Sequence, residues 1–268
     1  MAKQTAERWG TALVTGASSG IGDAFARLLA AEGTDLVVVA RDRARLEELA
    51  TDLVSAHGVT VEVMAADLAD AGQLSDIEAR LADADHPIHL LVNNAGSGTV
   101  GRFWELPVDG EDAEIRLNVV ALSRLTHAAL GPMVQRGGGA VLNVASIAGL
   151  IAGVGCATYN ATKAFVVSLG DSVHEELAGT GVTLTTLLPG FTRTEFQARA
   201  AATEHTDNVP DFAWMSAEAV ASAALDATAA GRTRVVPGAV NRAVSTALDV
   251  VPTAVVRRVA GVSLRRAL

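Results

Sequence analysis

The sequence has one cysteine, few aromatic residues and no long hydrophobic segment. Because Cys156 is the only cysteine, an internal disulfide and a zinc site built from cysteines are excluded. No run of about 18 uncharged apolar residues occurs, so we expect no membrane span. The start, MAKQTAERW, lacks an apolar stretch long enough for a signal peptide, and we therefore expect a cytoplasmic protein.

Acidic residues outnumber basic ones in the chain as a whole. The net charge of −9 argues against a nucleic-acid partner, which would require a basic surface. Residues 231–268 differ, because they contain seven arginines and one acidic residue. We expect residues 239–268 to form two amphipathic helices separated by Pro252 that pack on the domain or on another subunit. A basic helix on a membrane surface is the alternative.

Short apolar strands alternate with amphipathic helices along most of the chain. This order predicts an α/β protein of the Rossmann type, with a doubly wound parallel sheet of about seven strands and helices on both faces. Residues 1–238 should form a single domain, with a lid at about 191–215. The expected strands are 11–14, 35–40, 59–65, 88–92, a strand ending at 146, 183–188 and 233–236. The expected helices include 44–57, 71–84, 217–230 and a region at 110–135 interrupted near Asn118 and Gly131-Pro132.

A glycine-rich turn, Thr15-Gly16-Ala17-Ser18-Ser19-Gly20-Ile21-Gly22, follows the first expected strand and precedes a helical pattern. Glycines let the backbone approach a ligand closely. The N-terminus of the following helix offers free N–H groups and the positive end of the helix dipole. This arrangement is typical of a pyrophosphate-binding turn.

Ser146, Tyr159 and Lys163 form the second candidate site. Ser146 follows an apolar strand, and the ends of parallel strands are where ligands bind in α/β sheets. Tyr159 and Lys163 are four residues apart, so on a helix they share one face. A nearby ammonium favours the phenolate, so we expect the pKa of Tyr159 to lie below its usual value.

With Asn93-Asn94-Ala95-Gly96 after the fourth strand and Pro189-Gly190 after the sixth, the sequence resembles the compact, single-domain branch of the short-chain dehydrogenase/reductase family. The resemblance extends from Thr11 to about Gly238. It implies an NAD(P)-dependent oxidoreductase that interconverts a carbonyl and a secondary alcohol, without a metal. The alternatives are a dinucleotide-binding regulator without turnover and an epimerase or dehydratase on the same fold.

The resemblance also implies a role for each matching residue. In the catalytic set, Tyr159 exchanges the proton, Ser146 orients the substrate oxygen, Lys163 supports Tyr159 and binds the ribose, and Asn118 holds a water. Asn93 and Asn118 are alternatively structural. The expected cofactor-binding residues are Gly16, Ser18, Ser19, Gly20, Ile21, Gly22, Arg41, Asp67, Leu68, Asn93, Ala95, Gly96, Tyr159, Lys163, Pro189, Gly190, Thr192 and Thr194.

The second strand ends in Val39-Ala40-Arg41, with no acid before the arginine. An acid there usually binds the ribose of NAD, whereas an arginine suits the 2′-phosphate of NADP, so we expect NADP. We expect the neighbouring Asp42 to cap the next helix.

Apolar residues in the loops expected to face the nicotinamide favour an apolar carbonyl or alcohol as substrate, although these residues would also serve to pack the lid. They are Ile147, Leu150, Ile151, Val154, Phe191, Phe196, Phe212 and Trp214. We expect a homo-dimer or homo-tetramer.

Overall fold

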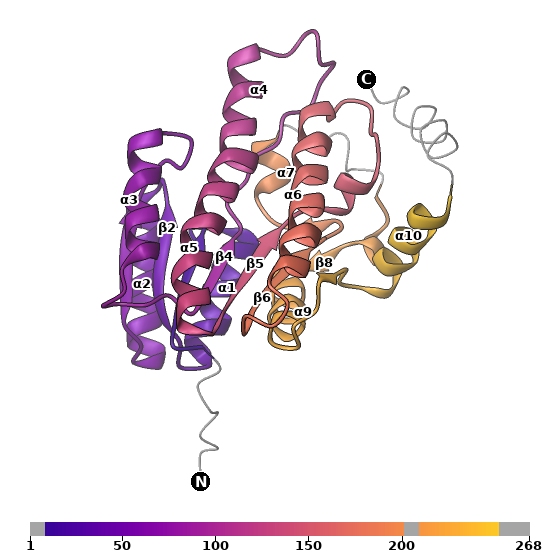
Figure 1. The fold of residues 1–268 in the computed structure, drawn as a ribbon. Coiled ribbons are helices and arrows are strands. Elements are labelled where there is room, and N and C mark those ends of the chain that lie inside the picture. The colour runs from indigo at the N-terminus through magenta and orange to yellow at the C-terminus, as the bar shows by residue number, and fades with distance from the viewer. Residues whose placement is uncertain (1–8, 201–208, 252–268) are drawn as a thin grey trace.

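Seven parallel strands form one sheet at the centre of the computed structural model, which describes residues 9–200 and 209–251 (Figure 1). The strand order is β3-β2-β1-β4-β5-β6-β9, and β7 and β8 form a separate parallel pair. The strands are β1 (Thr11–Thr15), β2 (Asp35–Ala40), β3 (Val61–Ala65), β4 (Leu90–Asn93), β5 (Gly139–Val144), β6 (Val182–Leu187), β7 (Thr192–Arg193), β8 (Met215–Ser216) and β9 (Arg234–Val235). The predicted single-domain, doubly wound fold is confirmed.

Helices cover both faces of the sheet. One face packs against α1 (Gly20–Ala31), α2 (Arg43–His57) and α9 (Ala217–Ala229). The other packs against α3 (Ala71–Ala82), α5 (Leu122–Arg136) and α6 (Ala157–Glu176), which stand side by side in Figure 1. Alternate strand residues point to opposite faces. In β1, accordingly, Ala12 and Val14 enter the first core and Leu13 the second.

The helical region after β4 differs in one respect from the prediction. It consists of α4 (Val108–Ile115), a π-helical turn (Arg116–Ala121) and α5. The π turn contains Asn118, so the first predicted interruption is confirmed. The second is wrong, because α5 continues through Pro132. Burial of Ala129 and Met133 in the core holds this part of the helix in place despite the hydrogen bond that Pro132 cannot donate.

The loop expected to form a lid contains the short helix α7 (Phe196–Arg199), and α10 (Ala239–Val250) follows β9. In α10, two of the apolar residues expected to pack on the domain or on another subunit are not covered by the domain. Val240 and Val244 are exposed, whereas Asn241 and Ser245, which each follow one of these valines, are buried on an adjacent face. The Asn241 amide donates to Pro237 O at 3.0 Å, so this polar face meets polar groups inside. The second predicted tail helix lies outside the described residues.

The sheet order reverses between β1 and β4, which are neighbours although two strands lie between them in sequence. The loops that leave the carboxyl ends of these strands diverge to opposite faces, and a crevice opens between them. Within the described part of the chain, no helix has both the length and the apolar character needed to cross a membrane.

Candidate active site

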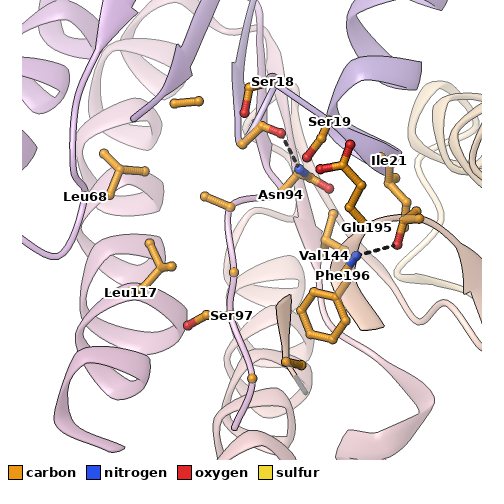
Figure 2. A pocket seen from close by; sticks show the side chains of 18 of the residues that line it. Ser18, Ser19, Ile21, Leu68, Asn94, Ser97, Leu117, Val144, Glu195 and Phe196 are labelled. Atoms are coloured by element: carbon orange, nitrogen blue, oxygen red, sulfur yellow. Dashed lines mark hydrogen bonds between the residues drawn. The ribbon is translucent and has the colours of Figure 1, made fainter. Parts of the chain in front are cut away.

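A cleft of about 820 Å³ lies at the carboxyl ends of the strands. Its walls come from the loops after β1 to β6, with Leu68 and Leu117 across from Ile21, Glu195 and Phe196 (Figure 2). Most of the residues expected at the site line this one cleft. They are Gly16, Ser18, Ser19, Gly20, Ile21, Arg41, Asp67, Leu68, Ala95, Gly96, Ser146, Tyr159, Lys163, Pro189, Gly190, Thr192 and Thr194.

The glycine-rich turn is packed too tightly for side chains at two of its positions. A Cβ on Gly16, whose φ is +67°, would lie 2.8 Å from Asn94 Nδ2. A Cβ on Gly22 would lie 2.1 Å from Gly16 O. Ser19 precedes α1 without capping it through its side chain, so the first N–H groups of α1 stay available at the cleft. This bare helix end above a glycine turn fits a dinucleotide pyrophosphate.

The end of β2 carries basic side chains at the cleft wall. Arg41 is exposed there, and Asp42 caps α2 by accepting a hydrogen bond from Arg45 N at 3.1 Å, as predicted. Arg45 also lines the cleft, and its Nη1 atom lies 3.0 Å from Glu195 Oε2. The sequence analysis missed Arg45, although its position one helical turn after Arg41 was a usable signal.

The side chain of Asn93 does not line the cleft. It is buried, and its Nδ2 atom lies 3.0 Å from both Thr126 Oγ1 and Asn143 Oδ1, in the core rather than in the cleft. Its neighbour Asn94 lines the cleft instead (Figure 2), and its amide donates to Thr15 O at 3.0 Å. Asn94 therefore ties the glycine-rich turn to the loop after β4, and the buried position of the Asn93 side chain fits the structural alternative for that residue.

Tyr159 and Lys163 project from the same face of α6 into the inner end of the cleft. Lys163 Nζ lies 5.7 Å from the centre of the Tyr159 ring and donates to Val144 O at 2.9 Å. Ser146, at the end of β5, accepts a hydrogen bond from Ala148 N at 3.1 Å. All three residues line the cleft, to which two elements bring them.

Asn118 lies behind this group rather than in the cleft wall. It is 1% exposed, and its side-chain amide donates to Ser97 O at 2.8 Å and to Thr162 Oγ1 at 3.1 Å. A Cβ placed on Gly96 would touch both Asn118 Oδ1 and Lys163 Nζ, at 3.2 and 3.5 Å. Gly96 thus leaves the space in which the two side chains approach each other.

The sequence predicts a Tyr159 pKa below its usual value, and this prediction is wrong for the effect of the protein's own groups, which raise it. Burial raises the pKa of Tyr159 to about 12, against the lowering effect of a hydrogen bond with Ser146. Glu114 and Cys156 raise it further. Burial also lowers the pKa of Lys163 to about 8. The sequence revealed the spacing of this pair but not the desolvation, which outweighs the attraction between them.

Of the eight apolar loop residues expected to face a substrate, only Phe196 lines the cleft. Its ring lies 5.7 Å from that of Tyr159, centre to centre. Phe191 and Trp214 pack against each other at 5.4 Å, and Phe212 is 74% exposed. The alternative interpretation, packing within the lid, holds for Phe191 and Trp214.

Comparison with known protein families gives one match over most of the chain. A family described as short chain dehydrogenase matches residues 10–205. Nodulation protein G of Rhizobium meliloti is 36% identical over 181 residues, which cover 67% of this chain and 72% of that protein. An uncharacterized oxidoreductase of Myxococcus xanthus is 38% identical over 189 residues, covering 70% and 74% of the two chains.

Solved structures of similar proteins extend the match. A short-chain dehydrogenase from Sphingobium yanoikuyae in complex with NADPH is 38% identical, with a TM-score of 0.82 over 90% of this chain and 92% of that one. A bulky-bulky ketone specific alcohol dehydrogenase from Comamonas testosteroni is 32% identical, with a TM-score of 0.77 over 92% and 96%.

Proposed function

Since the chain belongs to the short-chain dehydrogenase family, we propose that it is an NADP-dependent oxidoreductase that interconverts an apolar carbonyl and the corresponding secondary alcohol. The observation that carries this proposal is that one cleft contains both the bare N-terminus of α1 and the Ser146–Tyr159–Lys163 group. A dinucleotide held by the first would end beside the second. Nicotinamide, when bound, supplies or accepts the hydride.

In the proposed reduction, Ser146 donates a hydrogen bond to the substrate oxygen and fixes its orientation. Tyr159 then gives its proton to that oxygen, and in oxidation it takes the proton back. A raised pKa suits Tyr159 as the acid but not as the base. The positive charge of an oxidised nicotinamide would favour the phenolate, so cofactor binding is expected to prepare Tyr159 for oxidation.

Lys163 and Asn118 support the proton transfer. Only one of the three Lys163 N–H groups is used in the bond to Val144 O, which leaves donors for the ribose hydroxyls. Asn118 lies against the same space and is proposed to hold a water through which Tyr159 and Lys163 regain protons.

NADP is proposed over NAD because Arg41 lies at the cleft wall and the residue before it, Ala40, is not an acid. Asp42, the next residue in the sequence, is already engaged as the cap of α2. Arg45 adds a second guanidinium on the same side. The relative from Sphingobium yanoikuyae was solved with NADPH.

An apolar substrate is proposed because Phe196 packs against Tyr159 at the reacting end of the cleft. One structural relative is specific for bulky-bulky ketones, which fits this class. A dinucleotide-binding regulator is the second candidate. It would not need Tyr159 and Lys163 together in the cleft, and for this reason we favour the enzyme.

The direct experiment is a panel of apolar ketones and secondary alcohols, each assayed by the absorbance of the reduced nicotinamide with NADP(H) and with NAD(H). We expect turnover of several apolar ketones with NADPH and weaker turnover with NADH. Tight cofactor binding without turnover of any compound, in either direction, would favour the regulator.

We further propose a homo-dimer or homo-tetramer in the cytoplasm. The exposed valines of α10, Val240 and Val244, offer an apolar surface to another subunit. Light scattering of the wild type and of Val244→Glu tests this, because the charge should weaken association through α10. A lost affinity for anionic vesicles, with unchanged assembly, would favour the membrane alternative.

A further inference from the structure

Two glutamates are buried behind the catalytic helix, and the proposed reaction uses neither of them. Glu111 and Glu114 lie one turn apart on α4 and are 6% and 1% exposed. Burying an ionised carboxylate is costly unless its oxygens are bonded or its charge is paired. The hydrogen bonds around this pair therefore indicate how many protons it holds.

The pair needs one proton more than its neighbours supply. Thr99 Oγ1 lies 2.6 Å from Glu111 Oε1 and 2.8 Å from Glu114 Oε2, and Thr158 Oγ1 bonds Glu111 Oε2. Three oxygen-to-oxygen contacts each require a proton, and a threonine hydroxyl carries only one. The two threonines satisfy two contacts, so one of the carboxyl groups must be protonated.

The proton belongs on Glu114. Both oxygens of Glu111 are bonded by hydroxyl groups, as a carboxylate requires. Glu114 Oε2 also accepts from Thr99 N at 2.8 Å, but its Oε1 atom is buried without a partner among the described residues. Burial raises the pKa of Glu114, and the charge of Glu111 adds to this effect, against the lowering effects of Thr99 and Lys163.

Glu114 is electrostatically connected to the catalytic centre. Its charge raises the pKa values of Tyr159, Lys163 and Cys156, all of which lie on or just before α6. With Glu111, these are the titratable groups that interact with Glu114 in the described part of the chain. Thr158, which bonds Glu111, directly precedes Tyr159 on α6. The carboxyl pair thus contacts the catalytic helix and acts on its two central side chains.

We propose that Glu114 is a positioning residue that holds a proton behind the catalytic centre and sets how tightly Tyr159 holds its own. The catalytic role in this inference rests on the proposed function, whereas the titration that tests it does not. While Glu114 is neutral, Glu111 and Lys163 are the charged groups beside it in the described part of the chain. When Glu114 loses its proton, the new negative charge keeps Tyr159 protonated and Lys163 charged, which favours reduction over oxidation.

Tyr159 is the only tyrosine in the sequence, so the absorbance of tyrosinate reports its ionisation without a substrate. We would titrate the wild type and Glu114→Gln, each with and without NADP⁺. The control is Glu175→Gln, the same substitution at an exposed residue on the last turn of α6. The expected result is a lower Tyr159 pKa in E114Q alone. In the same variant, the rate of alcohol oxidation, which rises with pH as Tyr159 becomes a base, should begin to rise at lower pH. Equal titrations in all three proteins would overturn the proposal.

Infrared spectroscopy of the wild type keeps the test valid if E114Q fails to fold. With isotope-labelled glutamate, a protonated carboxyl stretch should be present near neutral pH, and its absence would overturn the proposal. Where E114Q folds, that band should disappear. Because the tyrosinate titration and the infrared band do not require turnover, an inactive protein with a shifted titration refutes the proposed function alone. An active protein with no shift refutes this inference alone.

Discussion

Replacing Lys163 with Met should change how the stability of the fold depends on pH. Lys163 is 5% exposed, and burial lowers its pKa from 10.5 to about 8. Each pKa unit corresponds to about 1.4 kcal/mol, so keeping this ammonium charged inside the protein costs roughly 3 kcal/mol. Methionine fills a similar space without that cost, but it gives up the bond to Val144 O, worth about 1 kcal/mol. The variant should therefore be the more stable protein near neutral pH.

The direction in which the stability changes with pH follows from the protons bound by the folded and unfolded states. Between about pH 8 and 10.5 the unfolded chain keeps a proton on Lys163 that the folded protein has released, so the wild type gains stability as the pH rises. Below about pH 8 both states are charged, and the full cost of burial is present. Above about 10.5 both are neutral, and the cost disappears.

Denaturant unfolding of both proteins at a series of pH values measures this effect. Groups that do not interact with Lys163 contribute nearly equally to both proteins. Because the pKa of Glu114 responds to Lys163, the same comparison made with Glu114→Gln in both proteins isolates Lys163. The difference in unfolding free energy should move in favour of the protein that keeps Lys163 by roughly 2–3 kcal/mol between about pH 7 and about pH 10. A difference that stays constant over this range would show that burial does not lower the pKa of Lys163 in the folded protein.

Two further substitutions test the cofactor end of the cleft. Arg41→Ala should weaken NADPH binding by about 1.5–3 kcal/mol, the range for a hydrogen bond to a charged group, and leave NADH binding nearly unchanged; equal loss for both would make Arg41 structural. Gly190→Ala should lower both the melting temperature and the affinity for NADPH, because its Cβ would lie 2.4 Å from Asn241 Oδ1. Recovery in the double variant with Asn241→Gly would identify that contact as the cause, and no recovery would exclude it.

The sequence was sufficient for the fold and for most of the cleft. Strand and turn patterns predict where each strand ends, and in a parallel sheet all those ends meet at one edge. For that reason Gly16, Arg41, Ser146 and Pro189 could be assigned to one site before their distances were known.

What the sequence could not reveal depends on which way a side chain points and on how well it is hydrated. Asn93 follows the alternation of β4, so it lies on the same side as Leu91, in the core that contains α5. The sequence motif gives no indication that Asn94 is the one at the cleft. The polar face of α10 points inward because Asn241 finds partners there, a tertiary effect that apolar periodicity does not report.

Turnover of Tyr159→Phe is the most direct test of whether the Tyr159 hydroxyl transfers the proton in this cleft. Phenylalanine keeps the ring, and with it the contact to Phe196, while removing the only group proposed to act as acid or base. The measurement is a pair of values from one preparation: the NADPH dissociation constant and the rate of ketone reduction at saturating cofactor. We expect the binding to be largely preserved and the turnover to fall by a factor of about 10²–10⁴, the usual contribution of a general acid. Turnover near that of the wild type, with NADPH bound equally well, would contradict the assignment.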